Sequence, residues 1–138
     1  MTNAELAGAH LQNSVLQATC HDAIQTNSHL EGADLTHASL TVVVSGGITG
    51  TTSLRVNWQL TANGYLIGPY ASLTNATLTG ENLTNARLDC VNLSGTDLTN
   101  ANPTGAALTG VTGAAKYNTA TTLPAGFNPI AAGWVLIC

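Results

Sequence analysis

Leucine recurs at every fifth position through the second half of the chain, a spacing that neither an α-helix nor a flat β-strand produces. A small or apolar residue usually lies two positions before each leucine. A threonine or serine usually follows the leucine, and asparagine or glycine often comes next. The leucine positions are Leu73, Leu78, Leu83, Leu88, Leu93 and Leu98, then Pro103 in the same phase, then Leu108.

The first half of the chain has the same five-residue pattern, with one slip in its phase. After three units the spacing shortens by one residue once, and the pattern then continues to residue 40. The eight residues in the leucine place are Leu6, Leu11, Leu16, Cys20, Gln25, Leu30, Leu35 and Leu40. Both halves therefore repeat one template.

Each unit predicts a short extended segment that is followed by a corner. The large and the small apolar residue are two positions apart, so both point to the same side of an extended backbone. Asparagine and glycine favour the turn that closes each unit. Repeating the unit winds the chain into a coil, and stacked coils bury one continuous inner column of side chains.

These tandem units resemble the pentapeptide-repeat family, whose consensus is A-(D/N)-L-x-x. The clearest matches are ADLTH (33–37), ENLTN (81–85), VNLSG (91–95) and TDLTN (96–100), within repeat arms at 4–40 and 71–110. The resemblance implies an all-β fold, a right-handed quadrilateral β-helix with about four pentapeptides per coil. Twenty residues per coil would stack Leu73 on Leu93, Leu78 on Leu98 and Leu88 on Leu108, with adjacent coils about 4.8 Å apart.

Two stretches, residues 41–70 and 111–138, lack the five-residue phase and contain the two tryptophans, Trp58 and Trp134. Each stretch has a Thr-Thr pair, then a leucine, then a Trp-x-Leu sequence. We therefore predict a single domain over residues 1–138, made of two modules, 4–70 and 71–138. Each module is a repeat arm followed by an aromatic segment, and we expect both tryptophans to plug or cover the inner column.

The chain finishes on a densely apolar run, PIAAGWVLIC (129–138), and no charged residue follows Lys116. An open β-helix end exposes unpaired strand edges, which invite aggregation unless something covers them. We expect Ile130, Trp134, Leu136 and Ile137 to fold back as a cap. The alternative is a homodimer through the C-terminal segment, which the resemblance also suggests, because the family includes dimers joined end to end.

Two residues depart from the repeat in the second arm. Glu81 occupies a place that the template gives to a small inward residue, so we expect its carboxyl group to be protonated, paired or turned outward, or to mark a local widening of the column. Pro103 occupies a leucine place but has no backbone N–H. We therefore expect it on the last well-formed coil of the arm, or at a corner where that donor is not needed.

The charge content limits the classes of partner that this protein could bind. Only 7% of the residues are charged and the formal net charge is −4. The three basic residues, Arg55, Arg87 and Lys116, cannot form a phosphate-binding stripe, so we expect no nucleic-acid partner. No apolar run is long enough to span a membrane, and the N-terminus lacks a secretory pattern. These features favour the cytoplasm, with the extracellular space or a virion surface as alternatives.

Candidate chemistry is sparse. His10 and His29 should stack one coil apart beside Glu31, and two histidines with a carboxylate could bind zinc or copper. A flat face offers no supporting shell for such a site, so we interpret these residues, with His21 and His37, as surface histidines. The three cysteines (Cys20, Cys90, Cys138) match neither a disulfide framework nor a zinc pattern. We predict no catalytic residue, no metal site and no cofactor, and hence a protein that is not an enzyme.

The predicted function is a structural or protein-interaction scaffold, which presents flat, weakly charged Thr/Asn/Gly faces to an unknown protein partner. The resemblance supplies an alternative, since some members of the family mimic duplex DNA and inhibit or protect DNA gyrase. That activity depends on acidic faces, and seven scattered carboxylates would imitate phosphate spacing poorly.

Overall fold

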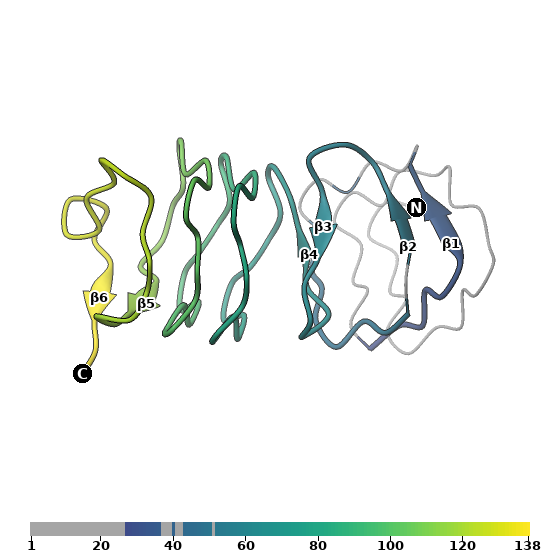
Figure 1. The fold of residues 1–138 in the computed structure, drawn as a ribbon, viewed down its shortest axis with the longest axis horizontal. Helices are drawn as coiled ribbons and strands as arrows, with labels where there is room; N and C mark the ends of the chain where they lie inside the picture. The colour runs from purple at the N-terminus through teal and green to yellow at the C-terminus, as the bar shows by residue number, and fades with distance from the viewer. Residues whose placement is uncertain (1–26, 37–39, 41–42, 51) are drawn as a thin grey trace.

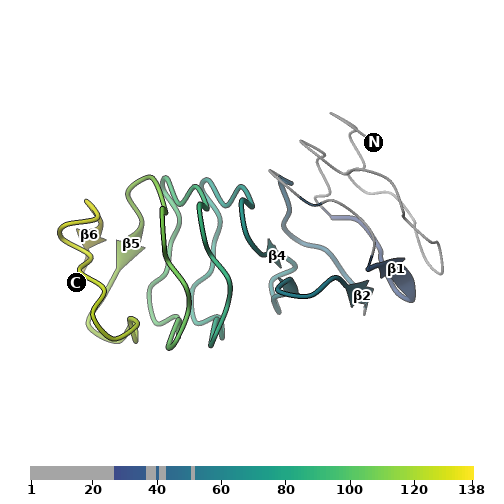
Figure 2. The same cartoon turned by 90° about the horizontal axis from the view of Figure 1, so that it is seen from above.

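The computed structural model describes residues 27–36, 40, 43–50 and 52–138. The expectations for the repeat units up to residue 26 lie outside these residues. The described chain forms successive coils that stack along one long axis, with the C-terminus at one end of the stack (Figures 1 and 2).

The described residues form six short strands. Two parallel pairs join segments one coil apart, β1 (Ala33–Leu35) with β2 (Thr52–Leu54) and β5 (Lys116–Tyr117) with β6 (Val135–Leu136). The third pair is an antiparallel hairpin of β3 (Gln59–Leu60) and β4 (Leu66–Ile67).

The second repeat arm has a register of twenty residues. Parallel bridges join Ser72 to Asn92, Thr77 to Asp97, Asn82 to Asn102, Arg87 to Ala107 and Asn92 to Thr112. Around the fourth of these, Leu88 N–H donates to the Ala107 carbonyl, and Ala107 N–H donates to the Ala86 carbonyl, each at 2.9 Å. The spacing confirms the predicted stacking of Leu73 on Leu93, Leu78 on Leu98 and Leu88 on Leu108.

Asparagine and glycine make most of the corners of the second arm, for the reason the pattern indicated. At one corner Ala76 N–H donates to the Leu73 carbonyl at 2.9 Å, which closes a four-residue turn. Asn75, the residue before Ala76, has φ of 59°, and Gly80 at the next corner has φ of 71°. Only glycine and, with less ease, asparagine accept this left-handed conformation readily, so the turn selects them at that place.

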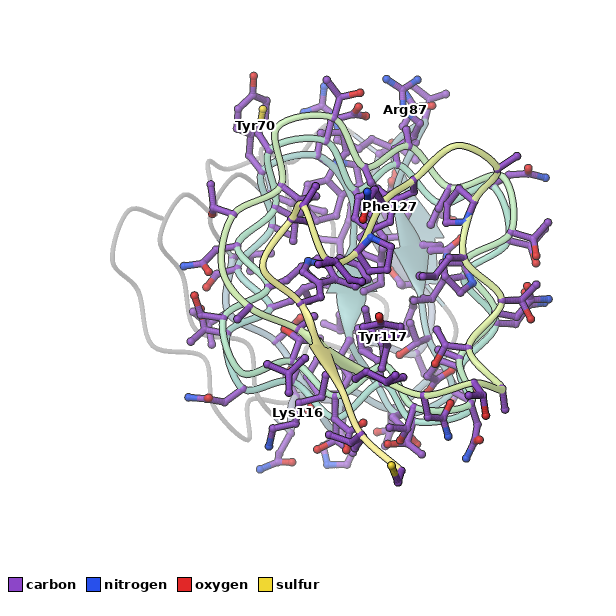
Figure 3. The ribbon with its side chains drawn as sticks, turned by 90° about the vertical axis from the view of Figure 1, so that its left-hand side faces the viewer. Tyr70, Arg87, Lys116, Tyr117 and Phe127 are labelled. Carbon is purple, nitrogen blue, oxygen red and sulfur yellow. The ribbon has the colours of Figure 1, made fainter. Side chains whose placement is uncertain are left out.

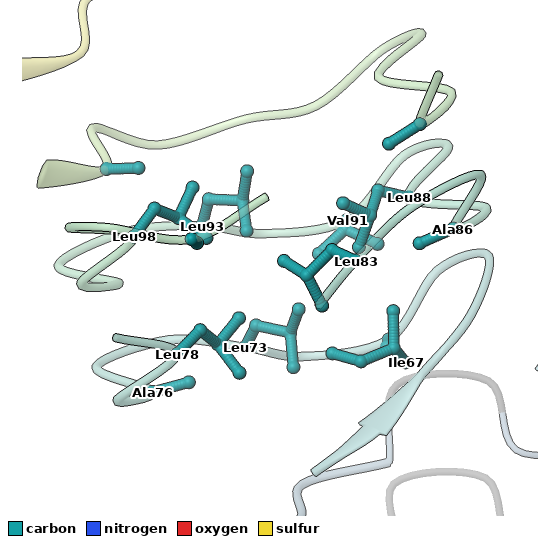
Figure 4. Packing of buried hydrophobic residues seen from close by; sticks show 14 of the residues in the cluster. Ile67, Leu73, Ala76, Leu78, Leu83, Ala86, Leu88, Val91, Leu93 and Leu98 are labelled. Carbon is teal, nitrogen blue, oxygen red and sulfur yellow. The ribbon is translucent and has the colours of Figure 1, made fainter. Parts of the chain in front are cut away.

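The inner column is the hydrophobic core (Figure 4). Six leucines of the second arm are almost completely buried, while Thr79 and Thr84, one position after two of them, face solvent. The buried leucines are Leu73, Leu78, Leu83, Leu88, Leu93 and Leu98, packed with small residues such as Ala76 and Ala86. Leu108, at the upper end of the arm, is only partly buried.

A smaller core lies below, around Leu30, Leu35 and Leu40, and the β3–β4 hairpin joins it to the main core. Trp58 packs against both clusters, so it seals the joint as expected. The Trp-x-Leu parts of the two aromatic segments differ in structure, because Gln59 and Leu60 belong to an antiparallel hairpin and Val135 and Leu136 to a parallel pair. The division into modules 4–70 and 71–138 stays a prediction.

The C-terminal segment covers the column only in part. Trp134 is buried, with 6% of its surface exposed, and its ring packs against Phe127 at 4.8 Å and Tyr117 at 6.3 Å between centroids. Ile130 and Leu136, which we expected in the cap, are 79% and 54% exposed. That part of the expectation was wrong, because the segment buries one aromatic side chain and leaves its own outer surface apolar and open.

Candidate functional site

The outward faces of the coils are built from a local hydrogen-bonded pair that recurs along the chain. Asn82 Oδ1 accepts the backbone N–H of Thr84 at 3.1 Å and its hydroxyl at 2.6 Å. Four further pairs have the same geometry: Asp34 with Thr36, Asn92 with Ser94, Asp97 with Thr99, and Asn102 with Thr104. Because each pair fixes both side chains, the polar groups of a face are held in a regular array.

Few charged side chains lie on the described faces, and two of them, Arg87 and Lys116, are labelled in Figure 3. Arg87 Nε donates to Asp89 Oδ2 at 2.8 Å. The N–H and hydroxyl of Thr99 hold the pKa of Asp97 below its ordinary value, and the nearby Lys116 adds to the effect. Among the described residues, Asp89 is therefore held by a cation and Asp97 by hydrogen bonds from Thr99.

Glu81, which departs from the repeat, makes a defined contact in the structure. Its side chain is buried, 6% exposed, and its carboxylate accepts the N–H of Asn63 at 2.7 Å and that of Ala62 at 3.3 Å. The carboxylate is therefore partnered, as one of our alternatives proposed, but by backbone amides and not by a cation. Glu81 ties the loop of the β3–β4 hairpin to the first coil of the second arm.

The structure places one histidine of the candidate metal pair. His29 Nδ1 lies 2.7 Å from the hydroxyl of Thr49 in the next coil, and Glu31 is exposed. His10, His21 and His37 lie outside the described residues, so the expected stacking of His10 on His29 stays a prediction. Among the residues with described positions, no group of three His, Cys, Asp or Glu could hold a metal ion.

One corner carries a phenol and a thiol that the sequence reasoning did not single out. Tyr70 has φ of 62° and a largely exposed ring, and Cys90 lies one coil above it with φ of 57° and a free, exposed thiol. The hydrogen bond and charge of Cys90 raise the pKa of Tyr70 above its ordinary value, with the nearby Asp89 as a smaller cause. The twenty-residue spacing of the two residues is the signal that could have found this pair.

Pro103 lies where the regular ladder comes to an end, which agrees with the expectation for it. Pro103 is buried in a leucine place. Two residues before it, the Ala101 carbonyl accepts the last ladder bond from the coil above, which Thr122 N–H donates at 3.1 Å. Beyond it the chain leaves the ladder. An open groove of about 330 Å³ lies between residues 106–109 and residues 124–127.

In the described part of the chain, no helix is long and apolar enough to cross a membrane. The cytoplasmic location stays a prediction. Comparison with curated proteins finds no significant match to the chain.

Solved structures of repeat proteins are similar to this chain at low identity. A pentapeptide repeat protein from Nostoc Pcc 7120 is 25% identical, with a TM-score of 0.37, covering 99% of this chain and 83% of that one. Rfr23, a pentapeptide repeat protein from the cyanobacterium Cyanothece 51142, is 20% identical with a TM-score of 0.36, covering 86% and 90%. QnrB1, a plasmid-mediated fluoroquinolone resistance protein, is 16% identical with a TM-score of 0.34, covering 99% and 79%.

These TM-scores are low, and the similarity to the family is found in the repeats themselves. The family model for pentapeptide repeats matches eight copies over residues 70–105. The match coincides with the arm in which the twenty-residue register, the asparagine and glycine corners and the leucine column are all observed. Residues 70–105 of this chain are therefore a run of pentapeptide repeats.

Proposed function

We propose that this protein is a non-enzymatic β-helical scaffold whose flat, weakly charged Thr/Asn/Gly faces bind another protein. In this proposal the coil is the right-handed, four-sided β-helix that the family resemblance implies. The observation that carries it is the recurrent Asn–Thr pairing, which holds outward polar groups in fixed positions at low charge. A preorganised surface loses little side-chain freedom when a partner binds.

The experiment compares two faces in capture from an extract of the native host. One variant places lysines at Asn82 and Asn102, which are stacked on one face, and the matched variant places them at Thr77 and Thr112 on other faces. Loss of one captured protein with one variant only, at unchanged thermal stability, supports a face-specific scaffold. Capture of no protein by the unmodified chain at any concentration contradicts the proposal.

The alternative, a DNA-mimicking inhibitor or protector of DNA gyrase, predicts a different result. Among the described carboxylates, Glu81 is buried on backbone amides and Asp89 is paired with Arg87, so few remain to imitate phosphates. A gyrase supercoiling assay with added protein discriminates the two. Dose-dependent inhibition, or protection from a quinolone, would favour the alternative and displace the scaffold.

The partner can also include a second copy of the chain. We propose homodimerisation through the C-terminal segment, supported by the apolar exposure of Ile130 and, on strand β6, of Val135 and Leu136. Sedimentation equilibrium of the unmodified chain and of Leu136→Lys tests this. A concentration-dependent dimer that the substitution abolishes supports it, and a monomer at all concentrations contradicts it.

A further inference from the structure

On the side of the second arm that contains Arg87 and Ala107, the ladder of backbone hydrogen bonds ends one strand before the top of the stack. In the lower coil, the Ala86 carbonyl and the Leu88 N–H both bond to Ala107, and Cys90 N–H donates to the Thr109 carbonyl at 2.8 Å. The register of twenty residues gives Ala106, Leu108 and Gly110 the same roles in the next coil. Their carbonyl and two N–H groups have no hydrogen-bond partner among the residues that the structure describes.

The segment after Thr122 would have to supply the missing hydrogen-bond partners, but it makes no backbone hydrogen bond to this edge. After Thr122 bonds to Ala101, residues 124–127 form a turn in which Phe127 N–H donates to the Pro124 carbonyl at 3.1 Å. Phe127 turns inward and packs on Trp134 (Figure 3). The groove of about 330 Å³ is what remains between this turn and residues 106–109.

We propose that this groove binds an extended, uncharged peptide segment of a partner protein, which adds a parallel strand to the open edge at residues 106–110. Addition of a strand to an exposed edge is a recurrent mode of peptide recognition, in which backbone hydrogen bonds give affinity and side-chain pockets give specificity. The bound strand continues the interface between coils that already exists from Arg87 to Ala107. This surface is separate from the flat faces, so the proposal does not depend on them.

The lining determines the chemistry of the peptide. None of the eight lining residues is charged: Ala106, Ala107, Leu108, Thr109, Pro124, Ala125, Gly126 and Phe127. A charged side chain would lose its hydration there without a partner, so small and apolar residues are favoured. The volume is at the lower end for ligand sites, which fits a few peptide residues and not a large ligand.

The geometry of the neighbouring coil specifies the bonds. One residue of the peptide takes the place that Ala107 has on the lower coil, so its N–H donates to the Ala106 carbonyl and its carbonyl accepts from Leu108 N–H. The chain's own segment TGAALTG (104–110) already pairs in this way with the coil below it. An acetylated and amidated peptide of that sequence is therefore the probe.

Amide NMR with hydrogen exchange tests the proposal on the full chain. In the free protein the Leu108 amide should exchange much faster than the Leu88 amide, which serves as the internal control. Added peptide should shift the amide signals of Leu108 and Gly110 and slow their exchange. A peptide whose second alanine is N-methylated lacks one N–H donor. Its affinity should be lower by about tenfold or by a larger factor.

Two matched variants locate the binding. Ala125→Arg places a charge in the groove lining and should weaken the peptide at least about tenfold, whereas Ala120→Arg makes the same change at an exposed alanine outside it. Protection of the Leu108 amide in the free protein, shifts at residues 135–136 in place of 106–110, or no shift at millimolar peptide would each overturn the proposal.

Discussion

The two ends of the second repeat arm are closed in different ways. At the lower end the β3–β4 hairpin enters the stack, and Glu81 accepts two N–H groups of its loop while Tyr65 Oη accepts the N–H of Thr77 at 3.0 Å. At the upper end Trp134 and Phe127 cover the column with rings, and the ladder beyond Pro103 is left open.

The difference shows that covering the side chains of a β-helix and satisfying its backbone edge are separate tasks. The hairpin covers the column and also reaches the backbone edge at Thr77, where Tyr65 Oη accepts the N–H and Asn63 Nδ2 donates to the carbonyl at 3.3 Å. The aromatic cap performs only the first. An end closed by packing alone keeps a free backbone edge, which is available to another chain.

The largest expected effect is the loss of stability when a leucine in the middle of the column is truncated, compared with one at its upper end. Leu88→Ala should lower the free energy of unfolding by about 2–5 kcal/mol, because it empties a fully buried site. Leu108→Ala, one coil above it, should cost only about 1–2 kcal/mol, because that side chain is partly exposed beside the groove. Chemical denaturation measures both, and Thr84→Ala is the exposed control. Equal losses at the two leucines would mean that the upper end is as closed as the middle.

Glu81→Ala tests the polar closure of the lower end. The substitution leaves the N–H groups of Asn63 and Ala62 without their acceptor, so we expect a loss of about 1–3 kcal/mol in the free energy of unfolding. Exchange of the Asn63 amide should also accelerate, measured by NMR. Glu31→Ala, at an exposed carboxylate, is the matched control. An unchanged Asn63 amide would show that the hairpin is held by its rings alone.

Two buried hydroxyls make an equivalent bond in the two regions. Thr96 donates to the Leu73 carbonyl at 2.7 Å within the arm, and Thr121 donates to the Leu98 carbonyl at 2.8 Å at the upper end. Replacing either by valine keeps the shape and removes the bond to the carbonyl, at a cost of about 0.5–1.5 kcal/mol. Thr121→Val also removes the bond that its hydroxyl accepts from Asn118 N–H at 3.1 Å, but Asn118 is partly exposed, so water replaces that bond. We expect the larger loss at Thr96, which is fully buried, in paired thermal melts. A larger loss at Thr121 would reverse the comparison.

The smallest effect concerns the ring that closes the upper end. Trp134 Nε1 is buried and has no hydrogen-bond partner among the described residues. Trp134→Phe removes this unsatisfied donor along with part of the ring. We therefore expect the cost of lost packing to be largely offset, with a net change within about 1 kcal/mol in denaturant melts. Trp58→Phe, at the sealed joint, is the matched comparison, and a loss at Trp134 above that at Trp58 would show that the indole itself is required.

The sequence by itself determined the regular part of this protein. The five-residue spacing predicted the inward leucines, the outward threonines and the asparagine and glycine corners, because one backbone geometry repeats and each place in it accepts few residue types. The departures at Glu81 and Pro103 were recognisable as departures for the same reason. The prediction for Pro103 followed from a property of the residue alone, its missing N–H.

Only the tertiary structure decided how the irregular segments meet the coils. Periodicity carries no information where it is absent, so the hairpin at residues 59–67 and its bonds to Glu81 could not be read from the sequence. The similar Trp-x-Leu sequences adopt different pairings because one lies between two coils and the other has a described coil on one side only. The open edge at residues 106–110 arises in the same way, since a backbone group is unpaired only when no other part of the folded chain reaches it.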